Sequence, residues 1–589
     1  MRKLCKRKLW YLFLGLIAFS FTILLLYKHE IAVTTLFSKK IKPVVNEQQN
    51  LDSHQKNFDN LNNLLKNVTI PEEVLDPNSV WFGMKYKNTY GLPLSNDAIP
   101  PFEREEKDWI NFFPDLLKSR QNYHLKNPLQ DSDFFTRITS KVVTRNKLRY
   151  SVGDVFVAHI QARDQLMRNK TFGGDYFRAR LIRTRFGKVV DGIPCAIYDH
   201  ANGTYTVKAP LLMSGDFTLE VKLLLSVEGI DRWINFTEAP TIKRSYHHAL
   251  LKSNEKVVCG FHLDKFIEYN AKDLCDYSNP RTEEPWFCVR PPSGVCHPIV
   301  EHIVKVFRLD KLFLETTTTF GKFGEITGSG LKIEVTPKKE FSALGHYGTE
   351  YRGTVLPSGY FKNGRWESLQ QTLPIESVAS SRDCFSNKIV FFLGDSTIRQ
   401  FFEAAVNTFK LTHRGLQHGI DRQAPHIAES KENNITIYYR THGMPLELTG
   451  PASTRPYISD IIESLDFLQI GGPDVYLVLN VGVHMIHYHA FDYLHRLMGI
   501  KKAIVDHLKI HPETRFIIRG MNVVECTHEW ALFRFETIMR EVFKDLKDTV
   551  VLNLWDLTTI IPLADYHPKN VALDEEVRLL FSYVCNWNV

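Results

Sequence analysis

The strongest constraint on the fold is a strand–helix alternation in the last ~210 residues. Four apolar runs read as buried strands: 388–396 (KIVFFLGDS), 475–482 (VYLVLNVG), 515–520 (RFIIRG) and 550–556 (VVLNLWD). Helical patterns lie between them; after the first run, one helical face carries Ile398, Phe402, Ala405, Val406 and Phe409. Such alternation predicts an α/β domain with a mainly parallel sheet, whose sites lie beyond the carboxyl ends of its strands.

Polar residues that could act together follow three of these strands. The first strand ends in Gly-Asp-Ser, which places Ser396 at the start of a helix, where a free backbone amide can hold an oxyanion. Asn480 follows the second strand, and its amide could be a second oxyanion donor. Asp565 and His567 come late, and such a histidine could take the serine proton while an aspartate fixes its tautomer.

Each of these residues also has a purely structural interpretation. Ser396 could be only the residue that caps its helix, and on its own the Gly-Asp-Ser stretch favours that interpretation. His567, before a proline, could be a surface turn residue. The cluster of His484, His487 and His489 suggests a metal site, but no carboxylate lies at ligand spacing. We therefore expect no metal and interpret Ser396, Asn480 and His567 as one nucleophilic site.

The N-terminus predicts a membrane anchor. Residues 9–27 (LWYLFLGLIAFSFTILLLY) carry no charge and are long enough to cross a bilayer. Five of the seven net positive charges come from the lysines and arginines within residues 1–8, which favours a cytosolic tail. We expect a type II protein of the Golgi membrane, with a cleaved signal peptide and secretion as the alternative. The remaining charge, about +2, leaves no basic surface for nucleic acid.

Sequons and cysteines agree with a lumenal location. Asparagines in Asn-x-Thr sequons occur at five positions: Asn67, Asn169, Asn202, Asn235 and Asn434. Cys5 would be cytosolic, which leaves an even number in the lumenal part, Cys195, Cys259, Cys275, Cys288, Cys296, Cys384, Cys526 and Cys585. In an oxidising compartment we expect these eight to form disulfides rather than zinc sites.

Further domains are expected before the α/β part. Residues 28–130 are polar and aperiodic and read as a stem. From 131 to 255 short alternating runs separated by turns predict an immunoglobulin-like β-sandwich; in one of them Phe177, Ala179 and Leu181 should face in while Arg178 and Arg180 face out. Residues 256–300 form a small cysteine-rich unit, 301–380 a connecting segment, and 381–589 the α/β domain.

The cysteine-rich stretch CDYSNPRTEEPWFC (275–288) resembles the corresponding end of the neurexophilins, and the sandwich before it resembles their glycosylated domain. A generic disulfide knot is the alternative. The α/β part resembles the SGNH (GDSL-type) hydrolases and, within them, the PC-esterase branch. Together these resemblances indicate the neurexophilin and PC-esterase domain family.

The resemblance implies a Ser396–His567 acyl-transfer site, with Asn480 and a glycine as oxyanion donors; Gly443 is our choice for that glycine. The family pattern separates its late Asp and His by two residues, whereas Asp565 and His567 are separated by one, so Asp556 competes for the role of the acid. The implied activity adds or removes acyl groups, mostly acetyl, on glycans.

We therefore expect a Golgi O-acetyltransferase that acts on glycoprotein glycans, with sialic acid as the leading acceptor. No tightly bound cofactor is expected, and an acetyl donor such as acetyl-CoA would be a cosubstrate. Two alternatives stay open: an acetylesterase for the same glycans, and a catalytically idle ligand of a cell-surface receptor.

Overall fold

The computed structural model describes residues 140–587, except for 144–147, 239–244, 261–270, 279–285, 307–323, 339–356, 371–372, 375, 415–424, 444–449, 452–455, 487, 489, 527 and 547–548. The expected cytosolic tail, membrane helix, stem and Asn67 sequon lie outside these residues. Among the helices that the structure does describe, none is long and apolar enough to span a bilayer.

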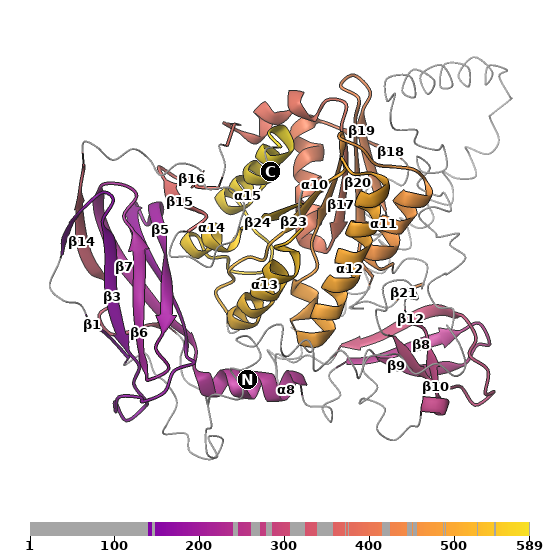
Figure 1. Cartoon of the computed structure of the whole chain (residues 1–589), viewed down its shortest axis with the longest axis horizontal. Coiled ribbons are helices and arrows are strands. Elements are labelled where there is room, and N and C mark those ends of the chain that lie inside the picture. Colours follow the sequence, from indigo (N-terminus) through magenta and orange to yellow (C-terminus); the bar gives the residue numbers. More distant parts are fainter. Residues whose placement is uncertain are drawn as a thin grey trace, which may run out of the picture. The chain divides into compact units, whose positions relative to one another are not determined.

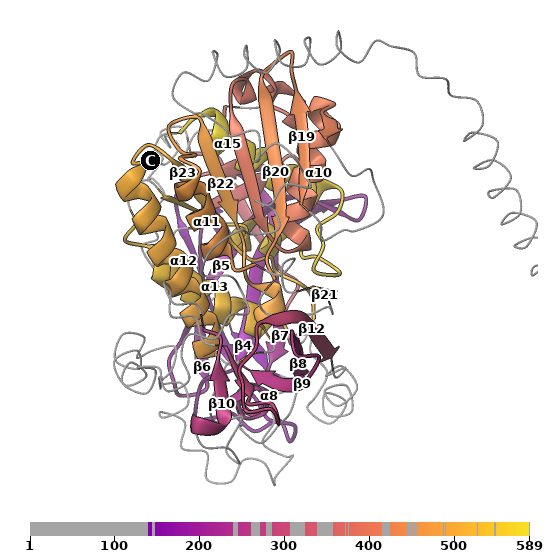
Figure 2. The same cartoon turned by 90° about the vertical axis from the view of Figure 1, so that its right-hand side faces the viewer.

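The C-terminal domain is built on one twisted sheet with the strand order β18-β19-β20-β17-β22-β23-β24 (Figures 1 and 2). The strands span Thr412–Arg414 (β18), His426–Ser430 (β19), Ile435–Thr441 (β20), Ile389–Gly394 (β17), Val475–Leu479 (β22), Arg515–Arg519 (β23) and Thr549–Leu552 (β24). The strands from β20 to β24 pair in parallel, and β19 and β18 add an antiparallel edge. The mainly parallel sheet was predicted, but β20 was not, and the fourth run ends as a strand at Leu552.

Helices cover the sheet as the strand–helix alternation requires. Their bounds are Ser396–Phe409 (α10), Ile458–Phe467 (α11), Ala490–Ile510 (α12), Glu529–Phe543 (α13), Trp555–Ile560 (α14) and Val571–Cys585 (α15). One apolar core joins β17 to the inner faces of α10 and α15, and it includes the whole predicted face of α10. Along the other side, α11 contacts α12 and α12 contacts α13 (Figure 1). The serine helix is therefore fixed by packing on the sheet.

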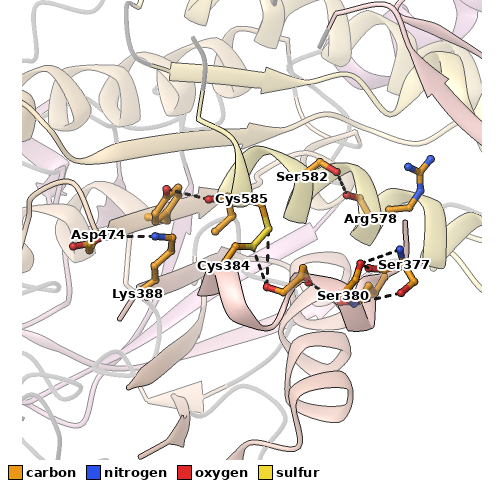
Figure 3. Close-up of a disulfide and its surroundings, with 12 residues drawn as sticks. Ser377, Ser380, Cys384, Lys388, Asp474, Arg578, Ser582 and Cys585 are labelled. Atoms are coloured by element: carbon orange, nitrogen blue, oxygen red, sulfur yellow. Dashed lines mark hydrogen bonds and ion pairs between the residues drawn. A yellow bond between two sulfur atoms is a disulfide. The ribbon is translucent and has the colours of Figure 1, made fainter. Parts of the chain in front are cut away.

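A disulfide closes this domain near its two ends. Cys384, just before β17, is bonded to Cys585 at the end of α15, at a sequence separation of 201 (Figure 3). Nearby, Lys388 forms an ion pair with Asp474 at 3.5 Å. The covalent link holds the first strand and the last helix of the domain together.

The preceding domain is β-rich, as the alternating runs predicted. Its strands are Lys141–Val143 (β1), Arg149–Ser151 (β2), Val155–Gln161 (β3), Tyr176–Arg185 (β4), Lys188–Asp199 (β5), Thr204–Pro210 (β6), Gly215–Leu225 (β7), Gly324–Glu325 (β13), Leu331–Thr336 (β14), Gly359–Lys362 (β15) and Arg365–Ser368 (β16). They run β1-β3-β6-β5-β4-β7-β14-β2, with β13 beside β7 and β15 beside β5 and β16. Alternate residues of β3, β4, β6 and β7 face a shared apolar core.

The prediction that Arg178 and Arg180 face water is wrong. Both side chains are buried, because the outer face of β4 is covered by the α/β domain. Arg178 Nη1 donates to Glu529 Oε2 at 2.5 Å, and Arg180 Nη1 donates to the Ile560 carbonyl at 2.5 Å. A strand with one apolar and one charged face can be buried on both sides when carboxylates and carbonyl oxygens accept hydrogen bonds from its charged side chains.

A third sheet holds the cysteine-rich region. Its order is β10-β11-β9-β8-β12-β21, with bounds Leu274–Asp276, Phe287–Val289, Lys256–Gly260, Ser245–Leu251, Ile299–Val306 and Gly450–Pro451. Two disulfides, Cys259–Cys288 and Cys275–Cys296, join its strands and the segment that follows them. The segment 301–380 is therefore more than a connector, since β12 belongs to this sheet and β13 to β16 belong to the sheet of the preceding β-rich domain. Helix α8 (Val227–Glu238) lies between the two regions in sequence.

The expectation that all eight cysteines after Cys5 form disulfides is wrong, because Cys195 and Cys526 are free. Burial raises the pKa of both thiols, that of Cys526 to about 11, so both stay protonated and unreactive. Among the sequon asparagines, Asn169 and Asn202 are exposed, and Asn434 is half-buried, with its amide donating to Asn387 Oδ1. The side chain of Asn235 lies outside the described residues.

Candidate active site

The site begins where β17 passes between its two parallel neighbours. The Gly394 carbonyl accepts a hydrogen bond from the His442 backbone N–H at 3.1 Å, and the Leu393 carbonyl accepts one from the Asn480 backbone N–H at 3.0 Å. A Cβ on Gly394 would lie 2.4 Å from the Asn480 backbone oxygen. Glycine is therefore required here by the close approach of two strand ends.

Asp395 and Ser396 start helix α10 directly after this glycine. Asp395 is the N-cap residue: its Oδ1 accepts from the Thr397 N–H at 2.8 Å and from the Thr397 hydroxyl at 2.6 Å. The cap is thus the aspartate, and Ser396 is not needed for it. As the first helical residue, Ser396 has no acceptor within the helix for its own N–H, which suits it to hold an anion.

His567 lies against the serine, although 171 residues separate the two along the sequence. Ser396 Oγ is 2.7 Å from His567 Nε2. If Oγ–H donates to Nε2, the other ring nitrogen, Nδ1, carries the imidazole proton. This is the contact that a serine nucleophile and its general base must make.

Asp565 is the carboxylate beside this histidine. Its Oδ1 lies 3.5 Å from His567 Nδ1 and also accepts the His567 backbone N–H at 2.6 Å. Its Oδ2 accepts from Lys569 Nζ at 2.9 Å. The hydrogen bond from Lys569, followed by that from the His567 amide, lowers the pKa of Asp565, so the carboxylate stays ionised.

The rival acid, Asp556, is engaged elsewhere. It lies in α14 rather than at a strand end, and its Oδ2 accepts from the Ser358 N–H at 2.7 Å, the Ser358 hydroxyl at 2.8 Å and Asn553 Nδ2 at 3.0 Å. Asp565 is therefore the better placed of the two carboxylates to orient His567.

The two expected oxyanion donors also have other partners. The Gly443 N–H donates to the Pro456 carbonyl at 2.8 Å, so this amide is not available to an oxyanion, and the choice of Gly443 is wrong in this conformation. Asn480 is buried at the carboxyl end of β22, and its Nδ2 donates to the Arg519 carbonyl at 2.9 Å. One N–H of that amide is left for a substrate.

Two further histidines meet at this edge of the sheet. His442 follows β20, and His484 lies in the short 3₁₀ turn Val483–Met485 after β22. His442 Nε2 is 3.1 Å from His484 Nδ1. Burial of Asp395 favours its neutral form, but His484, then the Thr397 hydroxyl and His442, outweigh it and lower the pKa of Asp395.

The loop that carries His567 is held in place from both sides. Tyr566 Oη is 2.5 Å from His528 Nδ1, and the His528 ring packs on Trp233 of α8 with centroids 5.2 Å apart. On the other side, Gln400 of α10 donates to the Pro568 carbonyl at 2.9 Å. These contacts fix a loop whose own side chains are largely in water.

Sequence reasoning placed Ser396, Asp565 and His567 in one site, and the structure brings them together. It missed His442, Asp395, Tyr566 and His528. His442 could have been found by the rule that identified Asn480, because it also follows a parallel strand, but that strand had not been recognised. Within the described part of the chain, no three His, Cys, Asp or Glu side chains form a metal site; His487 and His489 lie outside it.

Comparison with known families gives two matches, one to the C-terminal α/β domain and one to the region before it. Residues 366–585 match a family model described as the NXPE family member 4-like, C-terminal domain, and residues 116–312 match the neurexophilin model. The chain is therefore similar to the NXPE family in its C-terminal part and to the neurexophilins in the part before it. The first model contains Ser396, Asn480, Asp565 and His567, and the second contains most of the sandwich and the cysteine-rich sheet.

Among solved structures, the chain is similar to one titled crystal structure of the Lin-41 filamin domain. The identity is 17% and the TM-score 0.12, over 15% of this chain and 79% of that one.

Proposed function

We propose that this chain is a member of the NXPE family and a serine-dependent O-acetyltransferase that acts on glycoprotein glycans in the Golgi lumen, with sialic acid as the leading acceptor. The observation that carries the proposal is the 2.7 Å contact between Ser396 Oγ and His567 Nε2 at the N-terminus of α10. A serine with a base at this distance has few structural uses, because Asp395 already caps the helix.

The chemistry is acyl transfer in two steps. Ser396 Oγ attacks the carbonyl carbon of an acetyl donor such as acetyl-CoA, while His567 Nε2 takes the hydroxyl proton. The donor's leaving group departs with that proton, and the acetyl group stays on Ser396 as an ester. A sugar hydroxyl then attacks this ester and gives its proton to His567 Nε2. As the ester bond breaks, His567 passes a proton to Ser396 Oγ, so the O-acetyl sugar leaves and the free serine and neutral histidine are restored.

The openness of the site supports a large acceptor. The side chains of His567 and Asp565 are 45% and 48% exposed, so the base lies at the surface rather than in a closed cleft. A terminal sugar on a glycoprotein could reach it without unfolding a loop.

Two alternatives have specific support. The same exposure lets water reach His567, which would make the protein an acetylesterase for the same glycans. The neurexophilin match would suit a ligand of cell-surface receptors with an idle α/β domain.

The test compares cells that express the wild type, Ser396→Ala or His567→Ala, with glycan acetylation measured by mass spectrometry. Extra O-acetyl groups with the wild type alone support the transferase. Fewer acetyl groups with the wild type alone indicate the esterase. No difference among the three, at equal protein levels, favours the ligand and contradicts the proposal.

A further inference from the structure

The pair formed by His442 and His484 spans the end of the strand that carries the serine. His442 follows β20 on one side of β17, and His484 follows β22 on the other. Because their rings meet at 3.1 Å, the pair must bridge the carboxyl end of β17, where Asp395 and Ser396 begin α10. We call these two residues the histidine pair.

Asp395 gives this pair an electrostatic role. The carboxylate is 1% exposed, and both hydrogen bonds that it accepts from Thr397 go to Oδ1. Its Oδ2 is buried and accepts no hydrogen bond within the described part of the chain. A buried carboxylate in this condition requires a nearby positive charge.

The other buried charged side chains near Asp395 do not fully supply the positive charge that this carboxylate requires. Arg519, at the end of β23, donates from Nη2 to Glu576 Oε2 of α15 at 2.9 Å. Arg519 also lowers the pKa of Asp395, but less than either histidine does, so the histidine pair is the main source of positive charge beside this carboxylate. Two tyrosines also interact with Asp395, Tyr439 of β20 and Tyr493 of α12, and burial keeps both phenols neutral.

We propose that the histidine pair holds one extra proton as the counter-charge of Asp395, and that this positive charge stabilises the oxyanion that forms when Ser396 attacks an acyl group. The inference rests on the proposed acyl-transfer function. The two expected hydrogen-bond donors are partly occupied, because the Gly443 N–H donates to the Pro456 carbonyl and the Asn480 amide donates to the Arg519 carbonyl. A positive charge on the histidine pair would add to the stabilisation of the oxyanion. The histidine pair acts by its charge beside the N-terminus of α10, and no atom of it is required to touch the substrate.

The first test measures turnover of the acetyl donor p-nitrophenyl acetate against pH with the full-length protein. In the wild type the rate should fall at alkaline pH, as the histidine pair loses its extra proton. His484→Gln should lower kcat by ~10²-fold, leave KM unchanged and abolish the alkaline fall. Asp395→Asn keeps an N-cap of equal quality but removes the charge, so the alkaline fall should move at least about one pH unit lower.

The second test does not depend on activity. Diethyl pyrocarbonate modifies neutral but not protonated imidazoles, and peptide mass spectrometry gives the rate at each histidine. At pH 7, His484 should react several-fold more slowly in the wild type than in Asp395→Asn. His413, on the edge strand β18, is the matched control: its modification rate should be the same in both proteins, and His413→Gln should keep the wild-type pH profile.

The two proposals fail in different ways. If the wild type is no faster than Ser396→Ala, the acyl-transfer function fails, and the modification rates alone decide the protonation of the histidine pair. If the wild type is active but His484→Gln and Asp395→Asn keep its alkaline limb, the further inference is overturned and the proposed function stands. Equal modification of His484 in the wild type and Asp395→Asn also overturns it, as does a rise in KM with unchanged kcat.

Discussion

At the scale of single residues, the site assigns different tasks to two neighbouring aspartates. Asp395 caps α10 from a buried position, and Asp565 lies at the surface, where it shapes the His567 loop as much as it faces the imidazole. The Asp565–His567 separation of one residue lets the carboxylate accept the histidine's own backbone N–H. The family spacing of two residues would place the aspartate differently.

Substitution should separate the two candidate acids. We expect Asp565→Asn to lower kcat by ~10-fold, which is less than for a buried triad aspartate, because its side chain is half in water. Asp565→Ala should lose more, since it also removes the acceptor for the His567 N–H. Asp556→Asn should keep kcat and lower only stability, through its bonds to Ser358. A larger kcat loss in Asp556→Asn, measured with the same donor, would reverse the assignment.

At the scale of elements, the loop that carries His567 depends on side chains from other elements. Tyr566 contacts His528, the residue before α13, and His528 in turn packs on Trp233 of α8. Helix α8 precedes the cysteine-rich sheet in sequence, so part of the neurexophilin-matched region supports the loop of the α/β domain.

Removal of the Tyr566 hydroxyl tests whether its contact with His528 positions the His567 loop. Tyr566→Phe should reduce kcat about 3- to 10-fold with KM nearly unchanged, because a small misplacement of the general base slows proton transfer. The melting temperature should change little. Tyr360→Phe, in β15 of the sandwich, is the control and should retain full kcat. If Tyr566→Phe retains it too, the His528 contact is not needed to position His567.

Helix α15 adds a pH-dependent contribution to stability. Burial raises the pKa of Glu576 to about 7, although Arg519 works in the opposite direction. Because the folded pKa lies above the unfolded value, this contribution is fully present below about pH 4.5 and is lost as pH rises through about 7. The free energy of unfolding of the wild type should therefore decrease between pH 5 and 8 more than that of Glu576→Gln. Parallel curves from denaturant titrations of the two proteins would contradict this.

At the scale of the whole molecule, the Cys384–Cys585 disulfide encloses nearly the entire α/β domain (Figure 3). A link across 201 residues removes much chain entropy from the unfolded state. We expect the double variant Cys384→Ser, Cys585→Ser to lose ~2–5 kcal/mol of unfolding free energy in denaturant titrations. Cys526→Ser, which breaks no disulfide, is the control. A double variant as stable as this control would show that packing of α10 and α15 on β17 suffices.

Local sequence patterns predicted many of the core-facing residues and two residues of the candidate site. The period-two runs predicted the core-facing residues of β3, β4 and β7, and the apolar face of α10 is buried as its spacing required. The polar residues after parallel strands located Ser396, and the late Asp-x-His pair located its partner. These properties depend only on short stretches of neighbouring residues, so the sequence by itself determined them.

Other features depend on which distant segments meet, and only the tertiary structure decided them. Arg178 and Arg180 follow the pattern of an exposed face, yet the α/β domain buries them against Glu529 and the Ile560 carbonyl. The Gly443 N–H, expected to bind an oxyanion, donates to the Pro456 carbonyl instead. His442 contacts His484 across the end of β17. The sequence shows which side chains are polar, but their partners, and therefore their charges, follow from the packing of elements far apart along the chain.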